Sequence, residues 1–98
     1  KRRTSYEALF RILKFFARYD RENEFTKAQL KEISERLRDW YFDIGGGLYL
    51  SDECRDPYFS LKEQIATAID EAGSEPLDPT PLINAASRLR AFMREDVK

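Results

Sequence analysis

The sequence predicts an all-α protein, an antiparallel up-and-down four-helix bundle with a glycine-rich extended crossing between the second and third helices. Apolar residues recur at intervals of three and four along four segments, and this spacing places them on one face of a helix. The chain has only four glycines and four prolines, too few for the turns of a many-stranded β fold. The connections between the segments are mostly short, and short connections join antiparallel neighbours in a bundle.

The first segment predicts a helix over residues 5–21. Thr4 and Glu7 have the spacing of a capping box, in which both side chains satisfy free amides of the first turn. The other residues are mostly apolar, and their arc is wider than a surface helix needs. We expect either a central core helix or a helix that also contacts a second copy, a protein partner or lipid. Its polar edge is a candidate basic surface, formed by Arg11, Lys14, Arg18 and Arg21.

The second segment predicts a helix over residues 27–44. Thr26 is the expected N-cap, Gln29 completes a capping box, and Phe25 has the position of a hydrophobic staple. The apolar residues repeat at intervals of three and four, which is typical of helices that pack at a shallow angle. They are Leu30, Ile33, Leu37, Trp40, Tyr41 and Ile44.

A junction follows this helix, where three of the four glycines stand together. Gly45 is the expected helix stop, because glycine adopts the left-handed conformation at little cost. One glycine suffices for that role, so three in a row predict slack or a place where another group lies against bare backbone. Residues 48–50 are expected to be extended and to fold back over the bundle end. The candidate interaction or structural junction comprises Trp40, Tyr41, Phe42, Gly45, Gly46, Gly47 and Tyr49.

The third helix is predicted over residues 57–72. Ser51 has the position of an N-cap, but a helix that continued from Asp52 would contain Pro57. A proline inside a helix removes one hydrogen bond and collides with a carbonyl, at a cost of roughly 3 kcal/mol. We therefore expect a short turn over residues 52–55 and a helix that begins at Pro57, with a start at Asp52 as the alternative.

The fourth helix is predicted over residues 81–95. Thr80 is its expected cap, and Pro81 suits the first helical turn because its missing amide has no partner there in any case. The proline-rich stretch before it is expected to be a rigid connection within one domain. Residues 96–98 are expected to fray.

The composition excludes several chemistries. The sequence has no histidine, which removes Ser-His-Asp and Cys-His nucleophile pairs and His-containing zinc or di-iron sites. The single cysteine, Cys54, has no resolving cysteine beside it, and we expect a packed thiol in a reducing compartment. The glycines lack the following lysine and the preceding strand of a phosphate-binding loop. We therefore expect a protein that is not an enzyme and has no cofactor.

Acidic residues flank the glycines, and clustered carboxylates are the ligands that Ca²⁺ and Mg²⁺ prefer. The spacing of a calcium loop is absent, and Arg38 and Arg55 are close enough in sequence to pair with some of these acids. We interpret them as solvated acids at helix ends and expect no metal site. They are Asp39, Asp43, Asp52, Glu53 and Asp56.

The charge is uneven along the chain, although the net charge is only −1. Residues 1–21 hold seven basic and two acidic residues, a net +5, and residues 22–98 hold ten basic and sixteen acidic residues, a net −6. The basic first part and the acidic remainder can attract each other within one chain or between two copies. Alternatively, the basic part faces a membrane or nucleic acid. Residues 26–34 resemble the first helix of a helix-turn-helix, which is a DNA-binding motif. Nucleic-acid binding requires a basic face, however, and these residues lie in the acidic part of the chain, so such binding is not expected. The expected partner is another protein or a second copy, contacted through the first helix.

Four short stretches around the junction form a distinctive motif. They are Trp40-Tyr41-Phe42, Gly45-Gly46-Gly47-Leu48, Leu50-Ser51 and Tyr58-Phe59-x-Leu61. This motif, over residues 37–61, resembles one in uncharacterised bacterial proteins in which a helical cytosolic domain follows one or two membrane spans. The resemblance carries no known activity. It implies that Lys1-Arg2-Arg3 is the cytoplasmic flank of a membrane span, so we expect residues 1–98 to be a single helical domain cut from a longer chain.

The expected function is therefore that of a non-enzymatic helical interaction or accessory domain, cytoplasmic and tethered to a bacterial membrane in the full-length protein. The alternative is a small-ligand or effector-binding module. In that case we expect a pocket between Gly45–Gly47 and the aromatic end of the bundle.

Overall fold

The computed structural model describes residues 2–17, 26–43, 45–71 and 79–97. These residues form helices and no strand, so the all-α prediction is confirmed. The structure has five helices within the described ranges, where the sequence predicted four. They are α1 (Arg2–Ala17), α2 (Lys27–Phe42), α3 (Gly46–Tyr49), α4 (Asp52–Glu71) and α5 (Thr80–Asp96).

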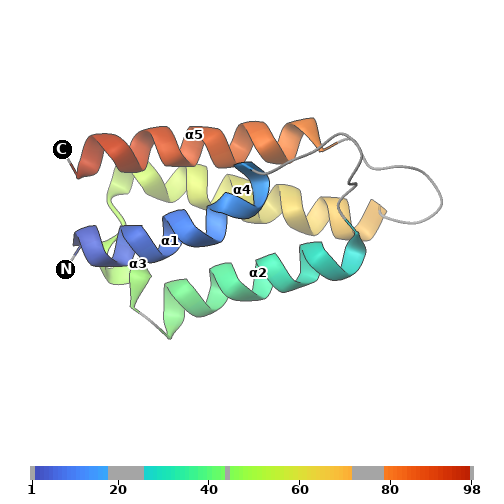
Figure 1. The fold of residues 1–98 in the computed structure, drawn as a ribbon, viewed down its shortest axis with the longest axis horizontal. Coiled ribbons are helices and arrows are strands. Elements are labelled where there is room, and N and C mark those ends of the chain that lie inside the picture. The colour runs from blue at the N-terminus through green and yellow to red at the C-terminus, as the bar shows by residue number, and fades with distance from the viewer. Residues whose placement is uncertain (1, 18–25, 44, 72–78, 98) are drawn as a thin grey trace.

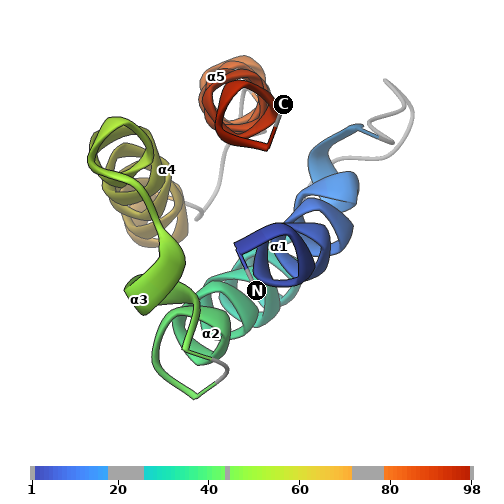
Figure 2. The same ribbon diagram turned by 90° about the vertical axis from the view of Figure 1, so that its left-hand side faces the viewer.

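The end-on view in Figure 2 shows the four long helices around a common centre. Their buried side chains form one hydrophobic core there. Helix α1 contacts α2 and α5, and α4 contacts the same two helices from the other side. The short α3 packs on α1 and α2, at the end of the molecule that also holds both marked chain ends (Figure 1). The largest fully buried side chains include Trp40, Tyr6, Tyr58 and Phe16.

Helix α1 begins earlier than the sequence predicted. It starts at Arg2, so Thr4 lies inside the helix and the predicted capping box at Thr4 is wrong. The reason is tertiary packing, which supplies most helical stability in proteins. Tyr6 is fully buried, and the Arg2 Nε donates a hydrogen bond of 2.8 Å to the Tyr49 carbonyl of α3. The predicted end of this helix, residues 18–21, lies outside the described residues.

Helix α2 follows the prediction closely because its start signal is local. The Thr26 Oγ1 accepts a bond of 3.1 Å from the Gln29 amide, and the Gln29 Oε1 accepts one of 3.0 Å from the Thr26 amide. This capping box satisfies two amides that a helix start leaves open. The predicted staple residue, Phe25, lies outside the described residues, as does Ile44. The buried residues of α2 are Leu30, Ile33, Leu37 and Trp40.

Helix α4 begins at Asp52, so the prediction of a start at Pro57 is wrong and its alternative is right. Ser51 caps the helix: its Oγ accepts a hydrogen bond of 3.3 Å from the Cys54 amide. Asp52 and Glu53 lie in the first turn, where acidic groups suit the positive end of a helix. Pro57 removes only the one bond to the Glu53 carbonyl, and its ring is buried.

Helix α5 starts one residue before its predicted start. Thr80 is the first helical residue, and Pro79 occupies the cap position, where its carbonyl accepts a bond of 3.0 Å from the Ile83 amide. Thr80 is therefore not the cap that the sequence predicted. At the other end the helix continues through Asp96, a residue that was expected to fray.

Among the described residues, no helix is both long enough and apolar enough to cross a membrane.

Candidate functional site at the helical junction

The predicted extended crossing at residues 48–50 is wrong, because Gly46–Tyr49 forms the single-turn helix α3. Gly45 has the left-handed conformation that the sequence predicted, with φ of 79°, but it is not the helix stop: α2 ends at Phe42 with Asp43 as its C-cap, and Gly45 directly precedes α3. The Leu50 amide donates to the Gly46 carbonyl at 3.0 Å, which closes the turn. The glycines therefore allow a sharp change of chain direction after α2, and they place the single turn of α3 directly against α2.

Gly46 is the place where bare backbone meets Trp40. A Cβ built on Gly46 would lie 2.4 Å from a carbon of the Trp40 indole, closer than real contacts allow. The indole has little room to retreat, because its Nε1–H donates a buried hydrogen bond of 2.8 Å to the Ser5 carbonyl of α1. Trp40 thus connects α1, α2 and α3, and the expectation of a close approach to glycine backbone is confirmed.

Gly47 makes the corresponding contact with Tyr41. A Cβ on Gly47 would lie 2.8 Å from the Tyr41 ring. That ring stacks on Tyr58 of α4, with centroids 5.4 Å apart, and Arg55 donates to its hydroxyl at 3.4 Å. Arg55 also reaches the Gly47 carbonyl at 3.5 Å. Tyr41 is therefore the hub that joins α2, α3 and α4 at this end of the bundle.

Three large apolar side chains around this hub remain exposed. Phe42 is 71% exposed, Leu48 85% and Phe59 45%. The rings of Phe42 and Phe59 lie 5.0 and 5.6 Å from that of Tyr41, and Leu48 follows Gly47, which lies against the same ring. We call Phe42, Leu48 and Phe59 the junction surface. The remaining predicted junction residue, Tyr49, is half-buried and accepts the bond from Arg2.

The acids that flank the junction are exposed. Two of them pair as the sequence predicted: Arg38 lies 3.8 Å from Asp39, and Arg55 lies 3.5 Å from Asp52. Exposed pairs of this kind contribute little to stability. Among the described residues, no group of three or more candidate ligands could hold a metal ion. The acids without an ion pair in the described part of the chain are Asp43, Glu53 and Asp56.

A polar cluster at the same end of the bundle was not predicted. Its centre is the Asp96 Oδ2, which accepts bonds from the Tyr6 hydroxyl at 2.8 Å, from the Cys54 thiol at 3.1 Å and from the Ser51 hydroxyl. The Ser51 amide in turn donates to the Tyr6 oxygen at 3.1 Å. The cluster therefore fastens the end of α5 to α1 and to the start of α4. Its members are 42 or more residues from Asp96 along the chain, so no local pattern announces them.

The protonation states in this cluster follow from burial and hydrogen bonding. Burial raises the pKa of Tyr6 to about 12, and burial also raises the pKa of the Cys54 thiol. Both groups therefore stay protonated and act as donors at neutral pH. Burial opposes ionisation of Asp96, but the hydrogen bonds from Ser51, Cys54 and Tyr6 outweigh it and hold the Asp96 pKa below its usual range. The expectation of a packed thiol is confirmed, since Cys54 is fully buried.

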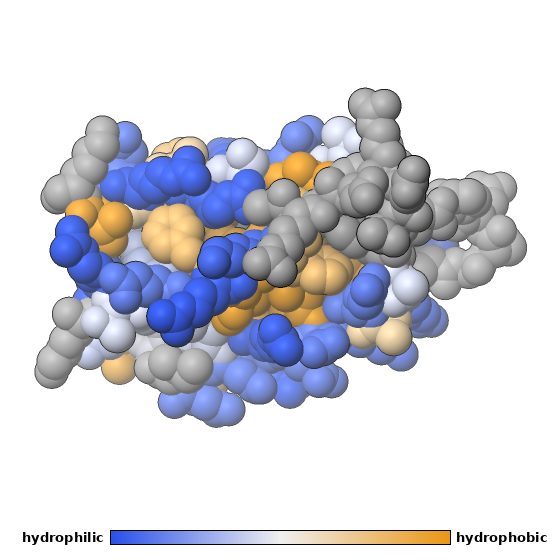
Figure 3. All heavy atoms as spheres, in the orientation of Figure 1, coloured by the Kyte–Doolittle hydropathy of each residue, from blue (hydrophilic) through white to orange (hydrophobic). Residues whose placement is uncertain are grey.

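The candidate basic surface lies on α1. Arg11 and Lys14 are exposed there, whereas Arg18 and Arg21 lie outside the described residues. Tyr6, Leu9, Leu13 and Phe16 point into the core. The rest of the apolar arc is only half-buried, and Figure 3 shows apolar side chains among charged ones on the face that α1 presents to the viewer. These half-buried residues are Ala8, Phe10, Ile12 and Phe15.

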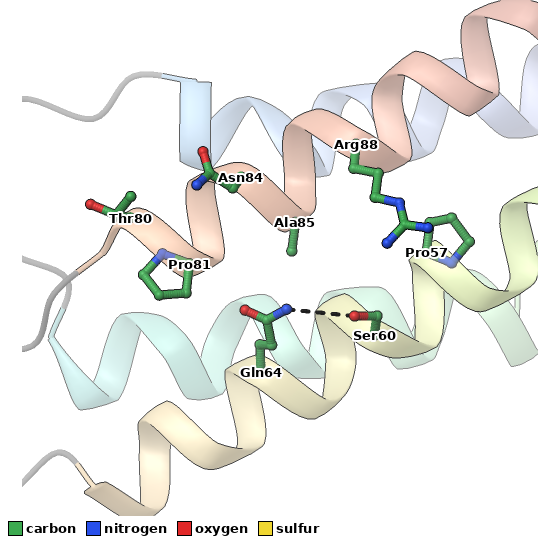
Figure 4. Close-up of a pocket in the computed structure, with 8 residues that line it drawn as sticks. All are labelled: Pro57, Ser60, Gln64, Thr80, Pro81, Asn84, Ala85 and Arg88. Atoms are coloured by element: carbon green, nitrogen blue, oxygen red, sulfur yellow. Dashed lines mark hydrogen bonds between the residues drawn. The ribbon is translucent and has the colours of Figure 1, made fainter.

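A groove of about 440 Å³ lies between α4 and α5 (Figure 4). Pro57, Ser60 and Gln64 line it from α4, and Ala85 and Arg88 are among the residues that line it from α5. None of its lining residues belongs to the junction, where aromatic rings fill the space beside Gly46 and Gly47. A ligand pocket beside the glycines stays a prediction.

No protein-family model matches the sequence, and comparisons with curated proteins and with solved structures find no significant match.

Proposed function

We propose that this chain is a non-enzymatic interaction domain that binds a protein partner through the junction surface. In this proposal the four long helices form an up-and-down bundle, and the junction caps one end of it. The observation that carries the proposal is the exposure of Phe42, Leu48 and Phe59 around the packed Tyr41 hub. Single exposed apolar residues are ordinary, but a group of them on a rigid support is typical of an interaction site.

The free energy available at this surface supports a specific contact. Fully burying one large apolar side chain yields about 1.5 to 3 kcal/mol. The support of these side chains is already ordered, because Tyr41 is held by Tyr58, by Arg55 and by the backbone of Gly47. Binding of a partner therefore costs little free energy for ordering this site. A small surface reaches measurable affinity only when that ordering cost is low.

Acidic residues close to the junction surface along the chain indicate the chemistry of the partner. The exposed carboxylates of Asp43, Glu53 and Asp56 have no ion-pair partner in the described part of the chain. Complementary charge steers association and sets specificity. We therefore propose that the partner presents an amphipathic segment with apolar residues on one side and lysine or arginine beside them.

The proposal is tested by placing a photoreactive residue at position 42 or 48 in cells that naturally produce the protein. The matched control carries the same residue at Glu35, which is exposed on α2. We expect one discrete crosslinked protein from positions 42 and 48 and none from position 35. Equal crosslinking from all three positions would contradict a site at the junction surface.

Binding of the purified crosslinked protein then gives the decisive comparison. Replacing Phe42 and Leu48 together by serine should weaken binding at least about tenfold, since each buried apolar contact is worth more than 1 kcal/mol. Both side chains are largely exposed, so the double variant should keep the melting temperature of the parent chain. Unchanged affinity in a folded double variant would refute the proposal.

We also propose that the full-length protein is anchored to a bacterial membrane with this domain in the cytoplasm. The basic start Lys1-Arg2-Arg3 and the resemblance of residues 37–61 support it. Sedimentation of the full-length protein with lipid vesicles tests the anchor, and recovery only in the supernatant would count against it.

Self-association through α1 is a separate proposal, supported by its half-buried Phe10, Ile12 and Phe15. A single monomeric species in equilibrium sedimentation at high concentration would exclude it.

A further inference from the structure

The open groove between α4 and α5 is large enough to hold a small ligand. Its volume of about 440 Å³ lies within the range of roughly 300 to 1,000 Å³ that is usual for such sites. Pro57 and Ala85 give it apolar walls, and Ser60 and Gln64 add polar groups. Figure 4 shows Arg88 extending from α5 toward Pro57 on α4, across the space between the two helices.

Arg88 gives the groove a positive charge that no lining residue neutralises. The residues that line the groove include no carboxylate. In the described part of the chain, Arg88 has no ion-pair partner within 4.0 Å. Its guanidinium carbon lies 5.8 Å from the centre of the Phe92 ring, a cation–π contact that orients the group without cancelling its charge.

Two further hydrogen-bond donors face the same space. The Gln64 Nε2 donates to the Ser60 Oγ at 3.5 Å, a long bond that costs little to exchange for a better acceptor. The second N–H of the Gln64 amide and the Ser60 hydroxyl hydrogen remain available to a ligand. Figure 4 shows both side chains on the groove side of α4, opposite Ala85.

We propose that this groove binds the carboxylate of a small organic acid. The planar guanidinium of Arg88 matches a carboxylate with two parallel hydrogen bonds, and Gln64 and Ser60 donate to its oxygens. The apolar walls of the groove favour an organic acid over inorganic phosphate, because a phosphate ion has no apolar body to bury there. The apolar body of the acid lies against Pro57 and Ala85. This site is separate from the junction surface and does not depend on the proposed partner.

The site is tested by titrating the isotope-labelled protein with benzoate and following backbone and side-chain amide signals by NMR. Benzamide, which has the same shape without the charge, and inorganic phosphate are the comparison ligands. We expect saturable shifts centred on Ser60, Gln64 and Arg88 with benzoate, and at least about tenfold weaker binding of benzamide and of phosphate. Equal binding of benzamide would overturn the assignment to a carboxylate, as would tighter binding of phosphate.

Three variants complete the test. Arg88→Gln should weaken benzoate binding at least about tenfold, and Gln64→Leu should weaken it by a smaller factor. Arg94→Gln makes the same charge change at an exposed position of α5 outside the groove and should leave binding unchanged. Equal loss in the Arg94 and Arg88 variants would show a general charge effect and overturn the site. Benzoate shifts that are absent, or that lie elsewhere in the parent protein, would also overturn it.

Discussion

Replacing Gly46 by alanine tests the packing of the junction. The new Cβ would lie 2.4 Å from the Trp40 indole, so either α3 or the indole must move. Overpacking of this kind costs about 1 to 3 kcal/mol. If the indole moves, the Ser5 carbonyl also loses its buried hydrogen bond, which adds about 1 to 3 kcal/mol. We therefore expect the free energy of unfolding to fall by about 1 to 3 kcal/mol if α3 moves and by about 2 to 6 kcal/mol if the indole moves.

Urea denaturation followed by tryptophan fluorescence measures this loss, and Trp40 is the only tryptophan of the chain. The matched control is Gly45→Asn in the same segment. A Cβ on Gly45 would make an ordinary contact of 3.9 Å with the Leu48 Cδ1, and asparagine tolerates the left-handed φ of 79°, so the control should lose less than about 1 kcal/mol.

A double-mutant cycle isolates the contact itself. Trp40→Phe replaces the indole that collides with the new methyl group by a smaller ring, so Gly46→Ala should cost at least about 1 kcal/mol less in that background. Because Trp40 is the only tryptophan of the chain, unfolding of the chains in this cycle is followed by circular dichroism. A loss below about 0.5 kcal/mol for Gly46→Ala alone, with an unchanged emission maximum, would contradict a collision between the new methyl group and the indole.

Three further predictions concern the helix starts and the polar cluster. Thr26→Ala should lower the free energy of unfolding by about 1 kcal/mol, and a loss below about 0.2 kcal/mol in urea denaturation would contradict its role as N-cap. Pro57→Ala should stabilise the chain by about 1 kcal/mol or more, because the alanine amide restores the bond to the Glu53 carbonyl; a lower melting temperature would count against that account. The pKa of Asp96 is held low in the folded state, so its stabilising effect is complete above about pH 4 and is lost as the pH falls through the folded-state pKa. Acid titration of unfolding should therefore show a shallower decline for Asp96→Asn than for the parent chain, and parallel curves would contradict the role of Asp96.

The features that the sequence predicted correctly depend on residues close together in the chain. The capping box of Thr26 and Gln29 lies within four residues, and it set the start of α2 correctly. The close approach at Gly46 was also predictable, because three adjacent glycines exceed what a helix stop needs. The identity of the approaching ring was not predicted, since contacts between side chains depend on how α3 folds back.

The errors arose where distant contacts outweigh local signals. The start of α1 was missed because Tyr6 is buried and Arg2 binds the Tyr49 carbonyl, 47 residues away. The end of α5 was expected to fray because nothing near Asp96 in the sequence indicates Tyr6, 90 residues away, as its partner. The local cost of a proline predicts a helix start at Pro57, but this cost leaves out the burial of the proline ring.

We propose that the partner binds at the junction surface rather than on α1. NMR shift mapping of the labelled chain with the crosslinked partner tests it most directly, because one spectrum reports on both surfaces. We expect the largest shifts at Phe42, Leu48 and Phe59. Largest shifts at Arg11 and Lys14 on α1, with the junction unchanged, would contradict it.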